Sequence, residues 1–144
     1  MPSMKYKCAL FTVAFLLSLT SAQSQNLGAG EIIHQLKKLQ NTSRVLYLAA
    51  HPDDENTRVI SWLENDRGIR TAYLSLTRGD GGQNLIGTEL GAKLGVLRTQ
   101  ELMQARQIDG GEQYFTRAVD FGYSKTAEET FKQWDKDQVL ADVV

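Results

Sequence analysis

The chain has 144 residues, the size of one domain, and 42% hydrophobic with 23% charged residues is an ordinary globular composition. Its 16 basic and 17 acidic residues give a formal net charge of −1, which argues against a nucleic-acid binder held mainly by phosphate contacts. A single cysteine excludes an intrachain disulfide framework and a cysteine-rich zinc finger.

The N-terminus has the pattern of a secretory signal peptide. Lys5 and Lys7 precede an apolar run from Cys8 to Leu19, and the small residues of 20–22 follow it. The alternative is an uncleaved membrane anchor, but the run is short for a helix that spans a bilayer. We therefore expect an exported protein, periplasmic or secreted, with no stable membrane span once the signal is removed.

Three segments are expected along the chain: a signal peptide over 1–22, a polar linker over 23–30 and an α/β domain over 31–144. Within the domain, apolar residues recur at helical spacing or form short strand-like runs. Helices are expected over 31–40, from about 54 to a stop at Gly68, over 88–108 before Gly110, and from 126 onwards. Strands are expected over 45–50, 69–77 and 113–119.

This alternation of helix and strand predicts a Rossmann-like fold class, with a mostly parallel, layered α/β sheet and right-handed crossovers. The run Val45 to Ala50 is continuously apolar, which is typical of a strand buried on both faces of such a sheet.

The last residues predict a helix whose apolar side is not closed by a cap. Val139, Leu140, Val143 and Val144 have the spacing of one helix face. No glycine, proline or terminal basic residue follows them. We therefore expect a truncated domain, incomplete at its C-terminus.

The candidate site is the turn after the first strand, His51-Pro52-Asp53-Asp54-Glu55. Sites in open α/β sheets form at the carboxyl ends of strands. The imidazole of His51 and the carboxylate of Asp54 are one helical turn apart, so both can point at one ion, and this donor pair suits zinc or a similar divalent metal.

Two further roles are expected within this turn. Asp53 can hold a metal-bound water and accept its proton. Glu55 can accept a hydrogen bond from the ligand histidine His51. The alternative for the whole turn is structural, with Asp53 or Asp54 capping the next helix and Pro52 stiffening its entry. The density of charge directly after a buried strand favours an ion.

Three motifs together resemble the PIG-L/LmbE family of zinc-dependent N-acetylglucosaminyl de-N-acetylases. They are the signature-like segment 48–55, the glycine-rich loop 77–82 and the helix motif Arg98-Thr99-Gln100-Glu101. The resemblance runs from about residue 44 to 109. It implies a Rossmann-like α/β fold and hydrolysis of an acetamide on an amino sugar.

Carried over residue by residue, the resemblance implies that His51 and Asp54 bind Zn²⁺, that Asp53 is the general base and that Arg98 contacts the substrate. Two features depart from the family pattern. Asn56-Thr57-Arg58 stands where small residues are usual. The family's third metal ligand is a histidine further along the chain, whereas no histidine follows His51 here.

Other residues keep two interpretations each. Arg98 and Glu101 can be a surface pair or part of the site. Residues 121–123 can form an aromatic platform for a sugar or pack within a loop. His34 is expected to be a solvated surface residue. The loop 79–82 lacks the spacing of a phosphate-binding loop, which favours a wall of a sugar pocket over a nucleotide site.

The expected function is that of a zinc-dependent hydrolase that removes an acetyl group from an N-acetylated amino sugar or a related acetamide. With only His51 and Asp54 as ligands, the 144-residue chain by itself is expected to be inactive, since a catalytic zinc normally uses three protein ligands. The alternatives are a non-catalytic carbohydrate-binding or interaction module that retains the turn, and a nucleotide-binding domain.

Overall fold

The computed structural model describes residues 27–144, so the predicted signal peptide and most of the linker lie outside the described residues. Residues 33–144 form one unit. In the described part of the chain, no helix has the length and apolar character needed to cross a bilayer. The helices are α2 (Ala29–Leu39), α3 (Thr57–Ser61), the π-helical turn η2 (Trp62–Asp66), α4 (Ala92–Asp109), α5 (Ala127–Thr130) and α6 (Lys136–Val143), and the strands are β1 (Arg44–Ala49), β2 (Arg70–Ser75) and β3 (Glu112–Phe115).

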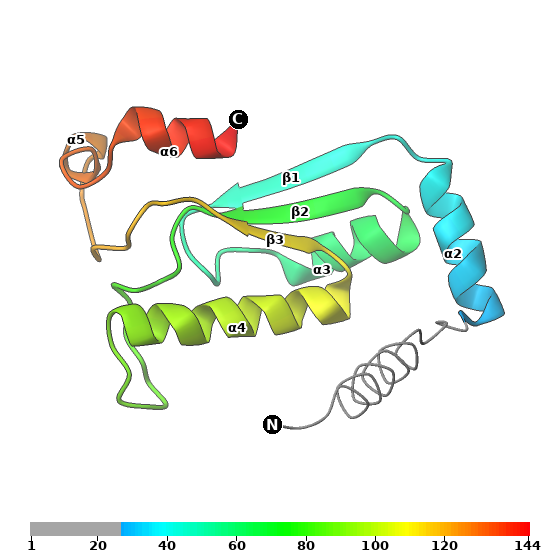
Figure 1. Ribbon diagram of the computed structural model, residues 1–144, viewed down its shortest axis with the longest axis horizontal. Coiled ribbons are helices and arrows are strands. Elements are labelled where there is room, and N and C mark those ends of the chain that lie inside the picture. The colour runs from blue at the N-terminus through cyan, green and yellow to red at the C-terminus, as the bar shows by residue number, and fades with distance from the viewer. Residues whose placement is uncertain (1–26) are drawn as a thin grey trace, which may run out of the picture. The chain divides into compact units, whose positions relative to one another are not determined.

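The three strands form a parallel sheet in the order β1-β2-β3. Each connection between neighbouring strands contains helix, with α3 and η2 between β1 and β2 and α4 between β2 and β3. Figure 1 shows α3 and α4 on the same face of the sheet. The predicted parallel, layered α/β architecture is confirmed.

The core lies between this sheet face and the two helices. Ile60 of α3, Tyr73 of β2 and Leu102 of α4 are buried together, and Tyr47 and Phe115 pack against them. Tyr47 and Tyr73 are partners in the strand register and meet edge to face, with ring centroids 5.8 Å apart. The core therefore ends directly beneath the turn that follows β1.

The expectation that β1 is buried on both faces is wrong for the structure described here. Burial alternates along the strand, and Leu46 and Leu48 are 50% and 48% exposed. The reason is that α3 and α4 lie on the face that carries Tyr47 and Ala49. A continuous apolar run does not by itself report how many faces of a strand are covered.

The predicted helices differ from the observed ones mainly at their ends. The helix expected from about residue 54 begins at Thr57, because the Asn56 side chain caps it by accepting the Val59 amide at 3.2 Å. The single helix expected after 126 is two short helices, because Asp135 caps α6 by accepting the Gln138 amide at 3.1 Å. Gly68 and Gly110 end their helices as predicted, with φ of +64° and +86°.

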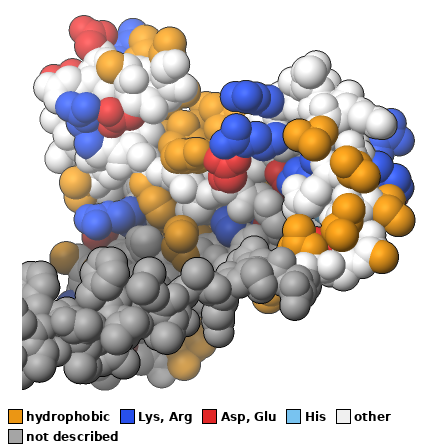
Figure 2. All heavy atoms as spheres, turned by 45° about the vertical axis from the view of Figure 1, so that its right-hand side comes forward, with side chains coloured by type: hydrophobic (Ala, Val, Ile, Leu, Met, Phe, Trp, Pro, Cys, Tyr) orange, Lys and Arg blue, Asp and Glu red, His pale blue; other side chains and the backbone are white. Residues whose placement is uncertain are grey.

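Helix α2 begins two residues before its predicted start, inside the predicted linker, and ends one residue before its predicted end. Its apolar residues Ile33, Leu36 and Leu39 are exposed, and Figure 2 shows hydrophobic side chains lying at the surface beside lysines and arginines. The Lys38 ammonium pairs with the buried carboxylate of Glu64 in η2. This ion pair fixes the C-terminal part of α2 to the helical layer, at the opposite ends of the strands from the predicted site.

Candidate active site

The turn after β1 is closed by its own hydrogen bonds. The backbone amides of Asp53 and Asp54 donate to the His51 carbonyl oxygen at 3.0 and 3.3 Å. In return, Asp54 Oδ2 accepts the His51 amide at 2.9 Å. The same carboxylate oxygen lies 3.4 Å from His51 Nδ1. The structure thus brings together the two residues predicted to bind a metal.

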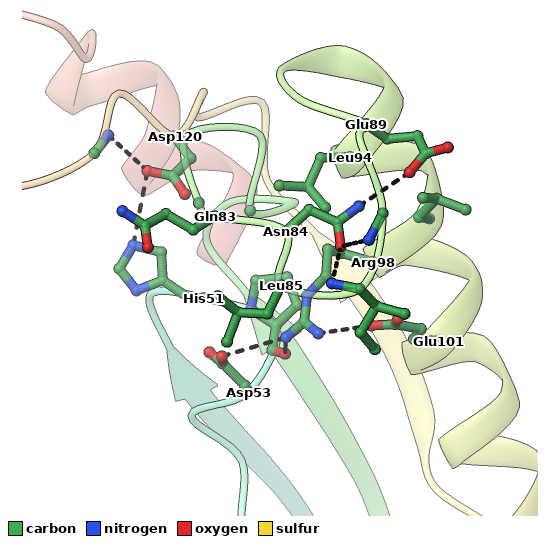
Figure 3. Close-up of a pocket in the computed structure, with 18 of the residues that line it drawn as sticks. His51, Asp53, Gln83, Asn84, Leu85, Glu89, Leu94, Arg98, Glu101 and Asp120 are labelled. Atoms are coloured by element: carbon green, nitrogen blue, oxygen red, sulfur yellow. Dashed lines mark hydrogen bonds and ion pairs between the residues drawn. The ribbon is translucent and has the colours of Figure 1, made fainter.

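Asp53 lies in the same turn, and its side chain is 72% exposed. Its carboxylate is 3.3 Å from Nη2 of Arg98, which reaches over from α4. Arg98 Nη2 also donates to the Pro52 carbonyl oxygen at 2.7 Å. Because Asn56 caps α3, Asp53 has no capping role and its carboxylate is directed to Arg98 (Figure 3).

Both interpretations of the Arg98 motif hold at once. Nη1 of Arg98 donates to Glu101 Oε2 at 2.6 Å, which is the predicted pair along the helix. The other end of the guanidinium binds the site turn through Pro52 and Asp53. Glu101 therefore orients Arg98 toward the turn, and Arg98 lines the pocket beside it.

A third loop brings Asp120 to the site, and this residue is not among those predicted from the sequence. Its side chain, which follows β3, is 6% exposed, and its Oδ1 lies 3.9 Å from His51 Nε2 and accepts the Gly122 amide at 2.9 Å. Figure 3 shows the Asp120 carboxylate facing the imidazole. The signal was available, because Asp120 is an acidic residue in the loop after the third strand of a parallel sheet.

These elements enclose a cavity of about 700 Å³. Its walls come from the site turn, the loop after β2, the N-terminal half of α4 and the loop after β3 (Figure 3). Asn84 and Glu89 bridge the two arms of the long loop at 3.0 Å. Leu85 and Ile86, at the rim, are almost fully exposed. His34 is not among the lining residues.

The glycine-rich loop follows β2 and packs against the site turn. Gly79 has φ of +76°, and a Cβ atom there would lie 3.2 Å from Pro52 Cδ. A side chain at this position would be strained and would also push on the turn. This close approach explains the glycine, and it agrees with the predicted role of the loop as a pocket wall.

Residues 121–123 divide between the two predicted roles. Phe121 packs edge to face on Trp134, with ring centroids 5.9 Å apart, so it serves loop packing. Gly122 and Tyr123 line the cavity, and the Tyr123 ring is 86% exposed. Only Tyr123 is therefore placed to offer an aromatic surface to a ligand.

Glu55 does not make the expected contact with His51. Its side chain is buried, and Oε1 accepts from Nη2 of Arg106 in α4 at 3.3 Å. The contacts of the His51 ring within residues 27–144 are instead with Asp54 and Asp120. The physical reason is that Glu55 points down into the core side of the turn, where a buried cation is available.

Two tyrosines hold the turn from below. The Tyr73 hydroxyl donates to the His51 carbonyl oxygen, and the Tyr47 hydroxyl donates to the Asp54 carbonyl oxygen at 3.4 Å. Burial raises the pKa of Tyr73 to about 12, and the negative charge of Glu55 also raises it. At neutral pH the Tyr73 hydroxyl is therefore a protonated donor to the start of the turn.

The donor set is of the right kind for a divalent metal, with an imidazole and a carboxylate on the same side of the turn. Within residues 27–144, however, no group of three His, Cys, Asp or Glu side chains is placed to hold a metal ion. His51 and Asp54 therefore fit two positions of a metal site.

The sequence model of the family described as PIG-L, GlcNAc-PI de-N-acetylase, matches residues 46–144. The chain belongs to the PIG-L family. The match covers the site turn, the glycine-rich loop and α4, and it extends to the last residue given, beyond the segment that the sequence motifs indicated.

Among solved structures, the chain is similar to N,N'-diacetylchitobiose deacetylase from Pyrococcus horikoshii, with 20% sequence identity and a TM-score of 0.45. The alignment covers 72% of this chain and 42% of that one, so the chain spans less than half of the solved protein's length. No curated protein matches the chain in sequence.

Proposed function

We propose that this PIG-L family protein removes the acetyl group from an N-acetylated amino sugar or a related acetamide, with Asp53 as the general base. The observation that carries the proposal is that the acidic residues of the turn have different partners. His51 and Asp54 face each other at 3.4 Å, while the exposed Asp53 carboxylate is held at the pocket by Arg98 rather than by a helix cap.

His51 and Asp54 are the residues of this segment that would hold a divalent metal. When bound, such an ion supplies Lewis-acid chemistry, polarising an amide carbonyl and lowering the pKa of a water. Asp53 lies between these two residues in the sequence, and its side chain lines the cavity (Figure 3). It is therefore placed to accept a proton from an attacking water.

The hydrolysis consumes one water. A bond forms from the water oxygen to the acetyl carbon, the C–N bond breaks, and acetate and the free amine are released. Asp53 accepts a proton from the water and passes it to the departing nitrogen, which leaves as the amine, and the acetic acid formed loses its proton to the surrounding water. Arg98, beside Asp53, and Asp120, beside His51, both line the cavity, where they can hydrogen-bond sugar hydroxyls.

The test is acetate release from N-acetylglucosamine and N,N'-diacetylchitobiose by the purified full-length protein, after chelation and after return of Zn²⁺. We expect release that requires the metal and that is lost in Asp53→Asn. Glu128→Gln is a matched control, because Glu128 is an exposed carboxylate of α5 outside the cavity. Metal-independent release, or release retained by Asp53→Asn, contradicts the proposal.

A second function is supported by a separate observation. Within the described residues, two side chains rather than three, His51 and Asp54, are placed to bind a metal ion. A carbohydrate-binding module that has kept the turn would bind the same sugars without hydrolysis. Calorimetric binding of N,N'-diacetylchitobiose with no acetate release, with or without Zn²⁺, would favour this function over the hydrolase.

A further inference from the structure

Arg106 occupies a position of α4 that faces the core. It is buried together with two carboxylates, and the three side chains are only 4–6% exposed. Its Nη2 atom lies 3.3 Å from Glu55 Oε1 and 2.6 Å from Asp109 Oδ2. Glu55 is the last residue of the site turn, so this buried cluster joins α4 to the end of the turn.

Arg106 also reaches the start of the turn. Its guanidinium carbon lies 5.5 Å from the centroid of the Tyr73 ring, within the range of a cation–π contact. Tyr73 in turn donates its hydroxyl hydrogen to the His51 carbonyl oxygen. One side chain of α4 therefore acts on both ends of the turn, through Glu55 and through Tyr73.

The base of this arrangement is fixed at the end of α4. Asp109 Oδ1 accepts the Gly111 amide at 3.0 Å, and the Asp109 carbonyl oxygen accepts from Asn65 Nδ2 at 3.0 Å. Asp109 therefore holds Arg106 from a helix end that is itself tied to η2 and to the start of β3. The position of the Arg106 guanidinium is therefore restrained by Asp109 and not only by its contact with the turn.

Fold stability alone is a poor explanation for this cluster. Nε and Nη1 of Arg106 and Oε2 of Glu55 are buried without a hydrogen-bond partner among the described residues. Buried charges that are incompletely paired are costly, and apolar residues of the same volume often give an equal or more stable fold. What the cluster supplies is a defined geometry for the residues attached to it.

We propose that Arg106, held by Asp109, is a positioning residue that fixes the conformation of the His51–Asp54 turn. The expected effect on metal binding rests on the proposed function. The effect of Arg106 on the order of the turn does not, and it is tested in the metal-free protein.

Removing Arg106 alone would leave Glu55 as an unpaired buried charge, which can prevent folding. The test therefore uses the triple variant Glu55→Gln, Arg106→Met, Asp109→Asn, in which the whole cluster is neutral. Asn at 109 still offers an oxygen to the Gly111 amide. The control is Lys38→Met with Glu64→Gln, which neutralises a second ion pair with a buried carboxylate, at the opposite ends of the strands.

Amide hydrogen exchange of the metal-free protein is the first measurement. In the triple variant we expect the Asp53 and Asp54 amides, which donate to His51, to exchange at least tenfold faster, while the amides of β2 keep their rates. The control variant should leave the turn unchanged. Equal rates in the turn, or a uniform rise over the whole sheet, would overturn the proposal.

Metal binding is the second measurement, by competition with a chromophoric chelator and by the visible spectrum of Co²⁺. We expect about 10–100-fold weaker Zn²⁺ binding and an altered Co²⁺ spectrum in the triple variant, the usual size of effects from residues that orient ligands. If the unmodified protein binds no metal, the proposed function fails while the exchange result still decides the role of Arg106. If it binds metal and the variant binds equally well with the same spectrum, the positioning role is wrong.

Discussion

Gly81 lies so close to Asp120 that no side chain fits between them. A Cβ atom at Gly81 would stand 2.7 Å from Asp120 Oδ1, 2.9 Å from the Asp120 carbonyl oxygen and 2.6 Å from the Gly122 amide nitrogen. Two of these three atoms are backbone, so the contact cannot be relieved by a rotamer change. The loop after β2 thereby sets the position of the carboxylate that faces His51.

We expect Gly81→Ala to push the Asp120 loop away from His51. The fold should survive, with a loss of about 1–3 kcal/mol in the free energy of unfolding, the usual cost of overpacking. The KM for an acetylated sugar should rise more than kcat falls, because Asp120 is placed to bind rather than to transfer a proton. Gly30→Ala is the control, since a Cβ there meets nothing within 4 Å. Unchanged KM in Gly81→Ala would show that Asp120 does not contact the substrate.

Asp53→Asn should separate catalysis from metal binding. The carboxylate is exposed and its described partner is Arg98, so the turn does not depend on it for its hydrogen bonds. In the full-length protein we expect Zn²⁺ content close to that of the unmodified protein and a fall in kcat of about 10²–10⁴-fold, the usual contribution of a general base. Both are to be measured on one preparation, with Asp66→Asn as an exposed control. Loss of zinc in Asp53→Asn would make Asp53 a ligand.

In the full-length protein, His51→Ala should abolish tight metal binding without unfolding the chain. The imidazole is 44% exposed and takes no part in the core of Ile60, Tyr73 and Leu102. We expect a circular dichroism spectrum like that of the unmodified protein, together with loss of bound Zn²⁺ after dialysis. His34→Ala, at the other histidine, should retain the metal. An unfolded His51→Ala protein would indicate a structural rather than a catalytic site.

The sequence predicted the parts of this fold that depend on local chemistry. The turn His51–Glu55 follows an apolar run, and Gly68 and Gly110 end helices where a positive φ is needed. The capping role of Asn56 was missed, although asparagine is a favoured N-cap residue. Because Asn56 caps α3, Asp53 is not the cap of that helix, which was the alternative role predicted for it.

The residues that could not be predicted act over long distances in the chain. Arg106 is 51 positions from Glu55, and Tyr73 is 22 positions from His51. Neither separation has a periodicity that a sequence pattern could report. The expected pairing of Glu55 with His51 failed for the same reason, since the competing cation comes from α4, which follows α3, η2 and β2 along the chain.

The burial of the Tyr73 hydroxyl predicts a pH dependence of stability. The pKa of Tyr73 is raised to about 12 in the folded protein, whereas an unfolded tyrosine titrates near 10. Below pH of about 10 the hydroxyl is protonated in both states and its stabilisation is complete. Between about 10 and about 12 the unfolded chain ionises first, so the free energy of unfolding falls as the pH rises.

Tyr73→Phe should remove this dependence. At neutral pH the variant should be less stable by about 1 kcal/mol, the usual net value of one hydrogen bond. Above pH of about 10 the difference from the unmodified protein should shrink, because only the unmodified chain loses the contribution of Tyr73. Urea unfolding measured across this range checks it, with Tyr123→Phe, whose ring is exposed, as the control. Parallel pH profiles for Tyr73→Phe and the unmodified protein would mean that burial does not raise the pKa of Tyr73.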